Sequence, residues 1–164
     1  DLYREFMGLV KEYDISPAGL KLEITESAVI MDVPKQAALI EKLQAEGFVV
    51  EMDDFGSGYS SLNTLKDIPV DILKLDMKFM EKSKNTKRSA DIVQMVVAMA
   101  DKLGMPVIAE GVETKEQADF LGRIGCDIIQ GYYYAKPMSM EEFEQLLNKY
   151  PYRDIVQKGI GNDI

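Results

Sequence analysis

Apolar and polar positions along this chain follow two alternating patterns. Short apolar runs of the kind found in buried strands occupy residues 20–26, 48–53, 71–76, 106–110 and 127–131. Apolar residues recur at helical spacing over residues 2–13, 34–46, 59–67, 89–103, 114–124 and 139–149. Gly47, Pro69 and Gly104 lie where helices are expected to end, and residues 81–88 form a polar loop. The pattern predicts five strand–helix units.

Strands that alternate with helices predict an α/β fold with a parallel sheet. Five units alone would fit an open, flavodoxin-like sheet, whereas eight units would close a barrel. The first predicted element is a helix, so we expect further units upstream of residue 1. The length of 164 residues suits one domain with its own hydrophobic core.

Acidic residues gather where the predicted strands end. Four runs carry such acids, namely Glu23 with Glu26, Asp53 with Asp54, Asp76, and Glu110, and the fifth run ends in the amide Gln130. The carboxyl ends of parallel strands meet at one edge, where ligands bind. Converging carboxylates repel one another unless a cation lies between them, so we expect divalent metal ions.

Composition narrows the chemistry further. The net charge of −9 argues against a DNA or RNA polymer as partner, and the absence of histidine excludes Ser-His-Asp hydrolysis and His-ligated zinc. No apolar run approaches 18 residues, so no membrane segment is expected in the chain. Cys126 has no partner for an internal disulfide, and we expect it to be buried in a cytoplasmic protein.

Each local motif has a functional and a structural interpretation. Asp53 and Asp54 before a Gly-Ser-Gly turn suit either a metal-bound loop or a solvated turn. Lys74 and Asp76 share one strand face, which fits a lysine buried among carboxylates or a half-exposed strand. Glu110 ends a strand, while Glu113 also suits the first turn of a helix. The residues alone leave these alternatives open.

Taken in order, the motifs closely resemble the EAL domain family. They are Leu22-Glu-Ile-Thr-Glu-Ser27, Asp53-Asp-Phe-Gly-Ser-Gly-Tyr-Ser-Ser-Leu62, Lys74-Leu-Asp76, Ala109-Glu-Gly-Val-Glu113 and Gln130-Gly-Tyr132 with Lys136-Pro137. Family members are bacterial phosphodiesterases that hydrolyse cyclic di-GMP to linear pGpG. The resemblance covers residues 1–150 and implies a TIM-like (β/α)₈ barrel, which we expect to be incomplete here, with about five parallel strand–helix units. Residues 151–164 are expected to be a C-terminal extension.

The resemblance also implies roles for individual residues. It makes Glu23 and Asp53 metal ligands, with Asp53 bridging two Mg²⁺ or Mn²⁺ ions, and it places Asp54 and Glu110 at the second ion. Lys74 corresponds to the lysine that contacts the attacking water, and Asp76 to its acidic neighbour. Glu26 corresponds to the anchor of the Asp-Phe-Gly loop, and Glu113 and Gln130 to substrate-pocket positions.

The sequence departs from the family pattern at its start. The Glu-Ala-Leu signature and a metal-binding Asn are absent, and we expect both upstream of residue 1. The chain then corresponds to the last two-thirds of the domain, and we expect little or no phosphodiesterase activity from it alone. A homodimer and upstream sensory or GGDEF domains are further expectations from the resemblance.

Two other functions remain as alternatives. The first is a receptor that binds cyclic di-GMP without hydrolysing it and signals through a partner. The second is an unrelated barrel enzyme that uses a strand lysine and carboxylate-bound Mg²⁺ for proton abstraction, which the Asp-Asp-Phe-Gly loop disfavours.

Overall fold

Five parallel strands form one sheet in the order of the sequence. The computed structural model describes residues 2–56, 65–77, 86–126 and 128–149. The strands are β1 (Lys21–Thr25), β2 (Val49–Phe55), β3 (Ile72–Asp76), β4 (Val107–Glu110) and β5 (Ile128–Ile129). They are hydrogen-bonded in the order β1-β2-β3-β4-β5, and every neighbouring pair is parallel. The predicted α/β class and parallel sheet are confirmed.

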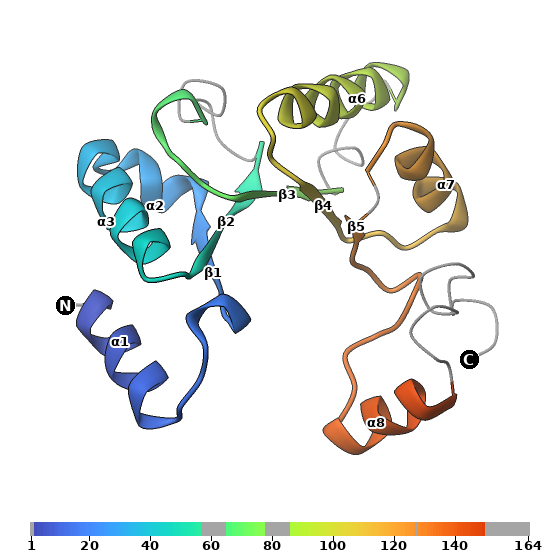
Figure 1. Ribbon diagram of the computed structural model, residues 1–164. Helices are drawn as coiled ribbons and strands as arrows, with labels where there is room; N and C mark the ends of the chain where they lie inside the picture. The colour runs from blue at the N-terminus through green and yellow to red at the C-terminus, as the bar shows by residue number, and fades with distance from the viewer. Residues whose placement is uncertain (1, 57–64, 78–85, 127, 150–164) are drawn as a thin grey trace.

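Helices connect the strands and cover one side of the sheet. They are α1 (Leu2–Glu12), α2 (Glu26–Ile30), α3 (Val33–Ala45), α6 (Thr86–Lys102), α7 (Lys115–Arg123) and α8 (Met140–Lys149), with a 3₁₀ turn η1 (Pro17–Gly19). The sheet curves, with α2, α3, α6 and α7 on its convex side (Figure 1). Helices α1 and α8 lie at its two ends, on either side of the open concave face (Figure 1). The architecture is an incomplete α/β barrel.

The hydrophobic core lies between the convex face and the helices. Alternate strand residues such as Met52, Leu73 and Ala109 point into it and are fully buried. Burial of a side chain such as that of Leu73 contributes about 1.5–3 kcal/mol. Cys126 is also buried, as predicted, and its Sγ lies 3.6 Å from the carbonyl oxygen of Val107.

Several helix boundaries follow from the predicted signals. Gly47 and Gly104 adopt φ angles of 95° and 72° just after α3 and α6, a backbone conformation that ends a helix and favours glycine. At the start of α7, the Thr114 side chain accepts a hydrogen bond from the N–H of Gln117, and the Gln117 side chain accepts one in return from Thr114.

Other predicted boundaries were wrong. Helix α6 begins at Thr86, so residues 86–88, predicted as loop, are helical. Their exposed Lys87 and Arg88 extend the helix as a solvated turn, without apolar periodicity. Glu26, predicted at a strand end, begins the unpredicted α2, because Thr25 caps that helix by accepting from the N–H of Ala28.

The last strand of the sheet is short, and some predicted segments lie outside the described residues. Only Ile128–Ile129 form β5, shorter than the predicted 127–131, although the N–H of Gln130 still donates to the carbonyl oxygen of Ala109. Ser57 and Gly58 of the Gly-Ser-Gly turn and most of the helix predicted over 59–67 lie outside the described residues, as do residues 151–164. No helix in the described part is long and apolar enough to cross a bilayer.

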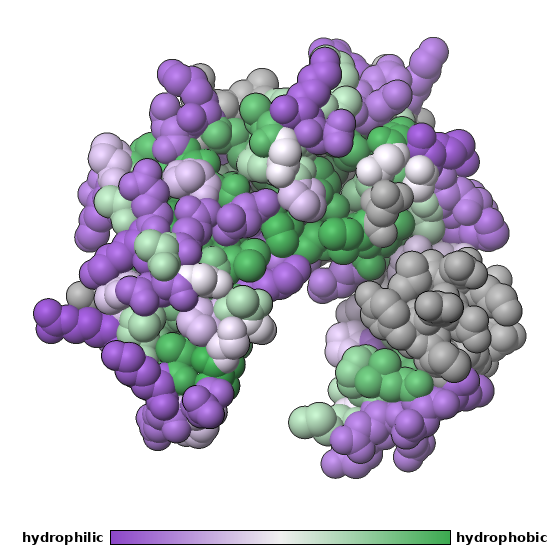
Figure 2. Space-filling view, viewed as in Figure 1, coloured by the Kyte–Doolittle hydropathy of each residue, from purple (hydrophilic) through white to green (hydrophobic). Residues whose placement is uncertain are grey.

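The concave side of the sheet is open in this structure. The space-filling view shows a notch between the part that contains α1 and the part that contains α8 (Figure 2). Strands β1 and β5 are the two edges of the described sheet, each with one strand neighbour. Residues on the inner face of the strands therefore border an accessible hollow, and most of the acids singled out by the sequence belong to that face.

Candidate active site

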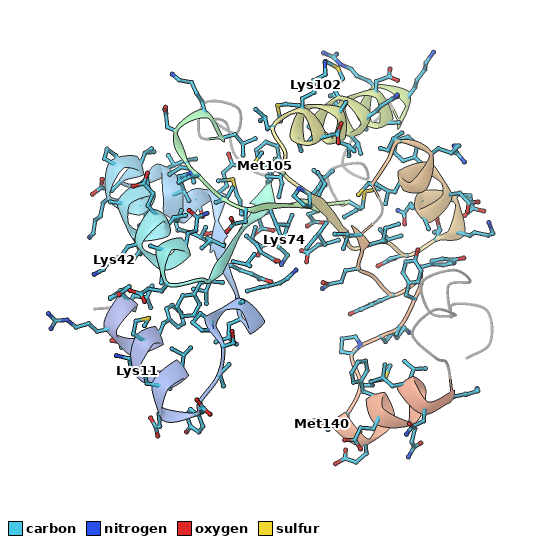
Figure 3. The ribbon with its side chains drawn as sticks, viewed as in Figure 1. Lys11, Lys42, Lys74, Lys102, Met105 and Met140 are labelled. Carbon is cyan, nitrogen blue, oxygen red and sulfur yellow. The ribbon has the colours of Figure 1, made fainter. Side chains whose placement is uncertain are left out.

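A buried lysine and three carboxylates meet on the concave face of the sheet. Glu23 comes from β1, Asp53 from β2, Lys74 from β3 and Glu110 from β4. Side chains alternate along a strand, so each of these residues points inward while its neighbours, such as Leu73, point to the helices. Figure 3 shows Lys74 on the concave side, away from the helices.

Lys74 is the centre of this group. Its Nζ lies 2.6 Å from Glu23 Oε1, 3.0 Å from Glu110 Oε1 and 3.6 Å from Asp53 Oδ1. Lys74 is only 5% exposed, which excludes the half-exposed interpretation of its strand. A lysine buried to this extent remains charged only when carboxylates surround it. The three carboxylates therefore stabilise the buried ammonium, and the ammonium reduces but does not cancel the repulsion among them.

The charges in this group shift two pKa values. Burial acts to lower the pKa of Lys74, but hydrogen bonds to Glu23 and Glu110, with the charges of Glu110 and Asp53, outweigh it and raise the pKa above its ordinary value. Burial raises the pKa of Glu110, and Lys74 only partly opposes this shift. The lysine thus stays protonated near neutral pH.

A bulge in β2 sets the direction of the Asp-Asp-Phe segment. Met52 pairs with Leu73, while Phe55 pairs with Leu75, so β2 contains one residue more than β3 over this stretch. Asp54 takes a φ of 55°, rare for a residue other than glycine, and its N–H donates to Asp53 Oδ1 at 2.9 Å. As a result Asp53 faces inward, Phe55 is buried in the core, and Asp54 is exposed at the strand end.

Glu26 contacts the segment that follows this bulge. Its side chain is fully buried at the start of α2, and its Oε2 accepts a hydrogen bond of 3.1 Å from the N–H of Gly56. A charged acceptor makes such a bond stronger than a neutral pair would. The contact ties the end of β2 to α2 across 30 positions of sequence.

The remaining predicted site residues lie farther along the same edge. Asp76 ends β3 in register with Glu110. Gly111 has a φ of 70°, and a Cβ there would lie 3.3 Å from Asp76 Oδ1, so the backbone passes close to this carboxylate. Glu113 and Gln130 line a cavity of about 710 Å³ together with Gly111, Gly131, Tyr132, residues 135–140 and Phe143. The structure thus separates an ionic centre from an adjoining cavity.

Sequence reasoning missed one ionic contact on the inner face. Lys21 Nζ lies 2.9 Å from Glu51 Oε1, although this oxygen is buried and accepts no hydrogen bond in the described structure. The distance makes the contact an ion pair, while its angles are not those of a hydrogen bond. A signal was available, since a single acid inside the apolar run Val49–Met52 falls on the same face as Asp53.

The ligand atoms available in this group have the chemistry that a hard divalent cation prefers, but their arrangement around Lys74 differs from that of a metal site. Glu23, Asp53, Asp54 and Glu110 offer only carboxylate oxygens, which suit Mg²⁺ or Mn²⁺ better than zinc. Within the described residues, however, no three acids are grouped so as to hold a metal ion by themselves. The carboxylates instead gather around the Lys74 ammonium, so a metal ion would share them with this lysine.

The parallel strand–helix units carry an acidic site around a lysine at the carboxyl ends of the strands. This arrangement is typical of α/β barrel domains, which bind their ligands at that end of the barrel. The EAL domain model matches residues 2–137, and the chain belongs to this family. The resemblance stated from the motifs is confirmed.

Curated relatives and solved structures agree with this assignment. The chain is 36% identical over 149 residues to cyclic di-GMP phosphodiesterase NbdA and 38% identical over 142 residues to cyclic di-GMP phosphodiesterase RocR, both of Pseudomonas aeruginosa. These matches cover 91% and 87% of this chain but 19% and 36% of the relatives. The chain therefore spans a fifth to about a third of their length.

Two solved structures show the same fold. The PaMucR phosphodiesterase in complex with c-di-GMP has a TM-score of 0.80 and 37% identity, covering 87% of this chain and 57% of that one. The EAL domain of Mycobacterium smegmatis DcpA has a TM-score of 0.77 and 40% identity, covering 87% and 64%. At these identities the likeness extends to the family as well as the fold.

Proposed function

We propose that this chain forms part of a cyclic di-GMP phosphodiesterase that hydrolyses one phosphodiester bond to give linear pGpG. The observation that carries the proposal is the convergence of Glu23, Asp53 and Glu110 on Lys74 at the strand ends. The names of NbdA and RocR support the substrate, since both are called cyclic di-GMP phosphodiesterases.

The acids of the site are the proposed ligands of two Mg²⁺ or Mn²⁺ ions. Glu23 and Asp53 would hold the first, Asp53 would bridge to the second, and Asp54 and Glu110 would also bind the second. Such ions supply a water of lowered pKa and neutralise phosphate charge when bound. This chemistry removes the need for histidine and allows an acidic protein to take an anionic substrate.

Lys74 and Asp76 are proposed to orient the attacking water. The Lys74 ammonium is a donor fixed in position by its carboxylate contacts, and it keeps its proton at neutral pH. It can therefore donate a hydrogen bond to the water oxygen and stabilise negative charge as it develops on the phosphate. Asp76 lies at the end of the same strand and can accept a proton from that water.

Substrate recognition is proposed for the adjoining cavity. Glu113 and Gln130 supply polar side chains, and Tyr132, Pro137 and Phe143 supply flat or apolar surface on the cavity wall. A guanine base needs hydrogen-bond partners at its edge and an apolar contact on its face. Glu26 is proposed to anchor the Asp-Phe-Gly loop through its bond to the N–H of Gly56.

The proposal is tested by chromatography of cyclic di-GMP incubated with Mn²⁺. The assay uses this chain and a longer chain that supplies the strand–helix units present in the PaMucR structure, because this chain covers 57% of that structure. Mn²⁺-dependent formation of pGpG by the longer chain, lost in Asp53→Asn, is the expected result. Hydrolysis that survives Asp53→Asn or needs no divalent ion contradicts the proposed mechanism.

A receptor that binds cyclic di-GMP without turnover is the second candidate. The observation that favours it is the central position of Lys74, whose ammonium offsets part of the charge of the three carboxylates around it. Calorimetry that shows binding by the longer chain, with no pGpG formed, supports this candidate over the enzyme. A homodimer, upstream sensory or GGDEF domains and a cytoplasmic location remain predictions.

A further inference from the structure

The concave face carries a second ionic contact that the proposed reaction does not use. Lys21 of β1 and Glu51 of β2 form an ion pair with 2.9 Å between Nζ and Oε1. Glu51 is 3% exposed, whereas the Lys21 side chain is 53% exposed. The negative end of the pair is therefore held inside the protein, while the positive end lies toward solvent.

Glu51 lies next to two of the carboxylates of the centre, Glu23 and Asp53. It is in register with Glu23 on the neighbouring strand, at an interstrand spacing of about 4.8 Å. It also precedes Asp53 by two residues on the same face, about 6.6 Å along the strand. The proposed ligands of the first metal ion thus have a third, buried carboxylate close to them.

The pair is a poor arrangement if stability is its only purpose. Glu51 Oε1 is buried and accepts no hydrogen bond from the described residues, so its charge is offset by a lysine that is half open to solvent. Burying a carboxylate costs free energy that an exposed ammonium recovers only in part. An apolar residue at this position would avoid that cost.

We propose that Glu51 is a positioning residue that raises the affinity of the carboxylate centre for a divalent cation, and that Lys21 limits this effect. The inference rests on the proposed function, because it takes Glu23 and Asp53 as ligands of the ion. A buried negative charge attracts a cation held about 10 Å away or less more strongly than a solvated lysine repels it, since water screens the lysine better.

The test is a calorimetric Mn²⁺ titration of this chain and three variants. Glu51→Gln is expected to weaken Mn²⁺ binding roughly tenfold, and Lys21→Met to strengthen it by roughly two- to threefold. The charge-swapped double variant, Lys21→Glu with Glu51→Lys, retains an ion pair but places the positive end in the buried position. It is expected to bind Mn²⁺ more weakly than Glu51→Gln does.

The Lys115–Asp119 pair on α7 offers a matched control. Both side chains are more than half exposed and 2.7 Å apart, so Asp119→Asn removes one carboxylate from an ion pair on the outer surface. We expect it to change Mn²⁺ affinity by less than about twofold, because water screens its charge. Thermal unfolding followed by circular dichroism identifies any variant that has lost its fold.

The outcomes separate the inference from the proposed function. If the parent chain binds Mn²⁺ and Glu51→Gln binds it equally well, the inference alone is overturned. If the charge-swapped variant regains the parent affinity, the pair is structural and the inference is likewise overturned. If the parent chain binds no Mn²⁺ while it remains folded, the proposed metal site fails as well. If Glu51→Gln does not fold, the Mn²⁺ affinities of the charge-swapped variant and of Lys21→Met, each compared with that of the parent chain, test the inference.

Discussion

Lys74 Nζ lies 2.6 Å from Glu23 Oε1, although the two residues are 51 positions apart in the sequence. The contact joins β1 to β3 across the intervening β2, which contributes Asp53 to the same lysine. Three adjacent strands are thereby linked through one buried ammonium. The same ammonium is the internal counter-ion of the acids proposed to hold metal ions.

Lys74→Met is expected to reduce turnover strongly and to lower the stability of the metal-free chain. The variant keeps the apolar stem but leaves Glu23, Asp53 and Glu110 without their shared cation. We expect activity of the longer chain to fall about 10²- to 10⁴-fold, because a donor to the reacting centre is lost. We also expect a lower unfolding temperature without Mn²⁺, partly restored by adding it.

Lys115→Met is the matched control for that experiment. It removes a lysine that is also ion-paired, but one exposed on α7. Its turnover and unfolding temperature should stay close to those of the parent chain, since exposed pairs contribute little. A Lys74→Met variant with unchanged turnover would exclude Lys74 from the reaction.

Gly131→Ala is expected to destabilise the chain strongly. A Cβ at this position would overlap the backbone of Val112, with 2.7 Å to its carbonyl carbon and still less to its oxygen and nitrogen. The backbone cannot yield as a side chain end can, so we expect a loss of about 2–4 kcal/mol in urea unfolding. The neighbouring hydrogen bonds from Val112 and Tyr133 would be strained at the same time.

Gly122→Ala is the control with the opposite expected sign. Gly122 lies inside α7, and a Cβ there meets no atom within 4 Å. Alanine is the better helix former, so the free energy of unfolding should rise by about 0.5–1 kcal/mol. Equal effects of the two substitutions would show that the contact between Gly131 and Val112 is not as tight as described.

Glu26→Ala is expected to release the backbone at Gly56. The substitution removes the buried acceptor of the Gly56 N–H, and a charged hydrogen bond of this kind contributes about 1.5–3 kcal/mol. Amide hydrogen exchange at Gly56 should become faster, and turnover of the longer chain should fall. Glu26→Gln keeps an acceptor oxygen and should retain part of the protection. Unchanged exchange in Glu26→Ala would rule out the anchoring role.

The Glu110 carboxyl is expected to titrate above the ordinary glutamate range when no divalent cation is present. Burial raises its pKa, so the folded chain binds this proton more tightly than the unfolded chain does. Lowering the pH through the raised pKa therefore favours the folded state at this residue, and the ionised form above it carries a stability penalty. Glu110→Gln removes this dependence.

Carboxyl NMR of the metal-free chain measures that pKa directly. Adding Mg²⁺ should lower it, because a bound cation favours the ionised carboxylate. Glu144, an exposed acid of α8, is the control in the same spectra: its carboxyl signal should not move when Mg²⁺ is added at constant pH. A Glu110 pKa that Mg²⁺ leaves unchanged would argue against this residue as a metal ligand.

Local sequence signals predicted most of the fold. The order of the five strands and of the predicted helices within the described residues was confirmed, apart from the additional helix α2, because each period arises from residues close together in the chain. The errors arose where polar residues formed helix without apolar periodicity, as at Lys87 and Arg88, or where a cap began a helix directly after a strand, as at Thr25. Strand β5 has two residues instead of the predicted five, because its pairing with β4 ends at Ala109.

The candidate site was predicted in outline rather than in its contacts. The sequence placed acids and Lys74 at strand ends, and the ordered motifs indicated the EAL family. It could not show which acids touch the lysine, since those distances depend on strand register and on the bulge at Asp53 and Asp54. Nor did it distinguish Glu51 from an ordinary strand residue, because burial of its carboxylate depends on neighbouring strands.

By itself, the sequence determined the parallel α/β class, the order of its elements and the acidic, histidine-free chemistry available to the site. These properties depend on residue type and local spacing, which the chain carries before it folds. Only the tertiary structure decided that Lys74 is buried among Glu23, Asp53 and Glu110, and that Lys21 pairs with Glu51 next to two of them. Burial and charge pairing act between strands that are distant in sequence, so their balance exists only once the sheet has formed.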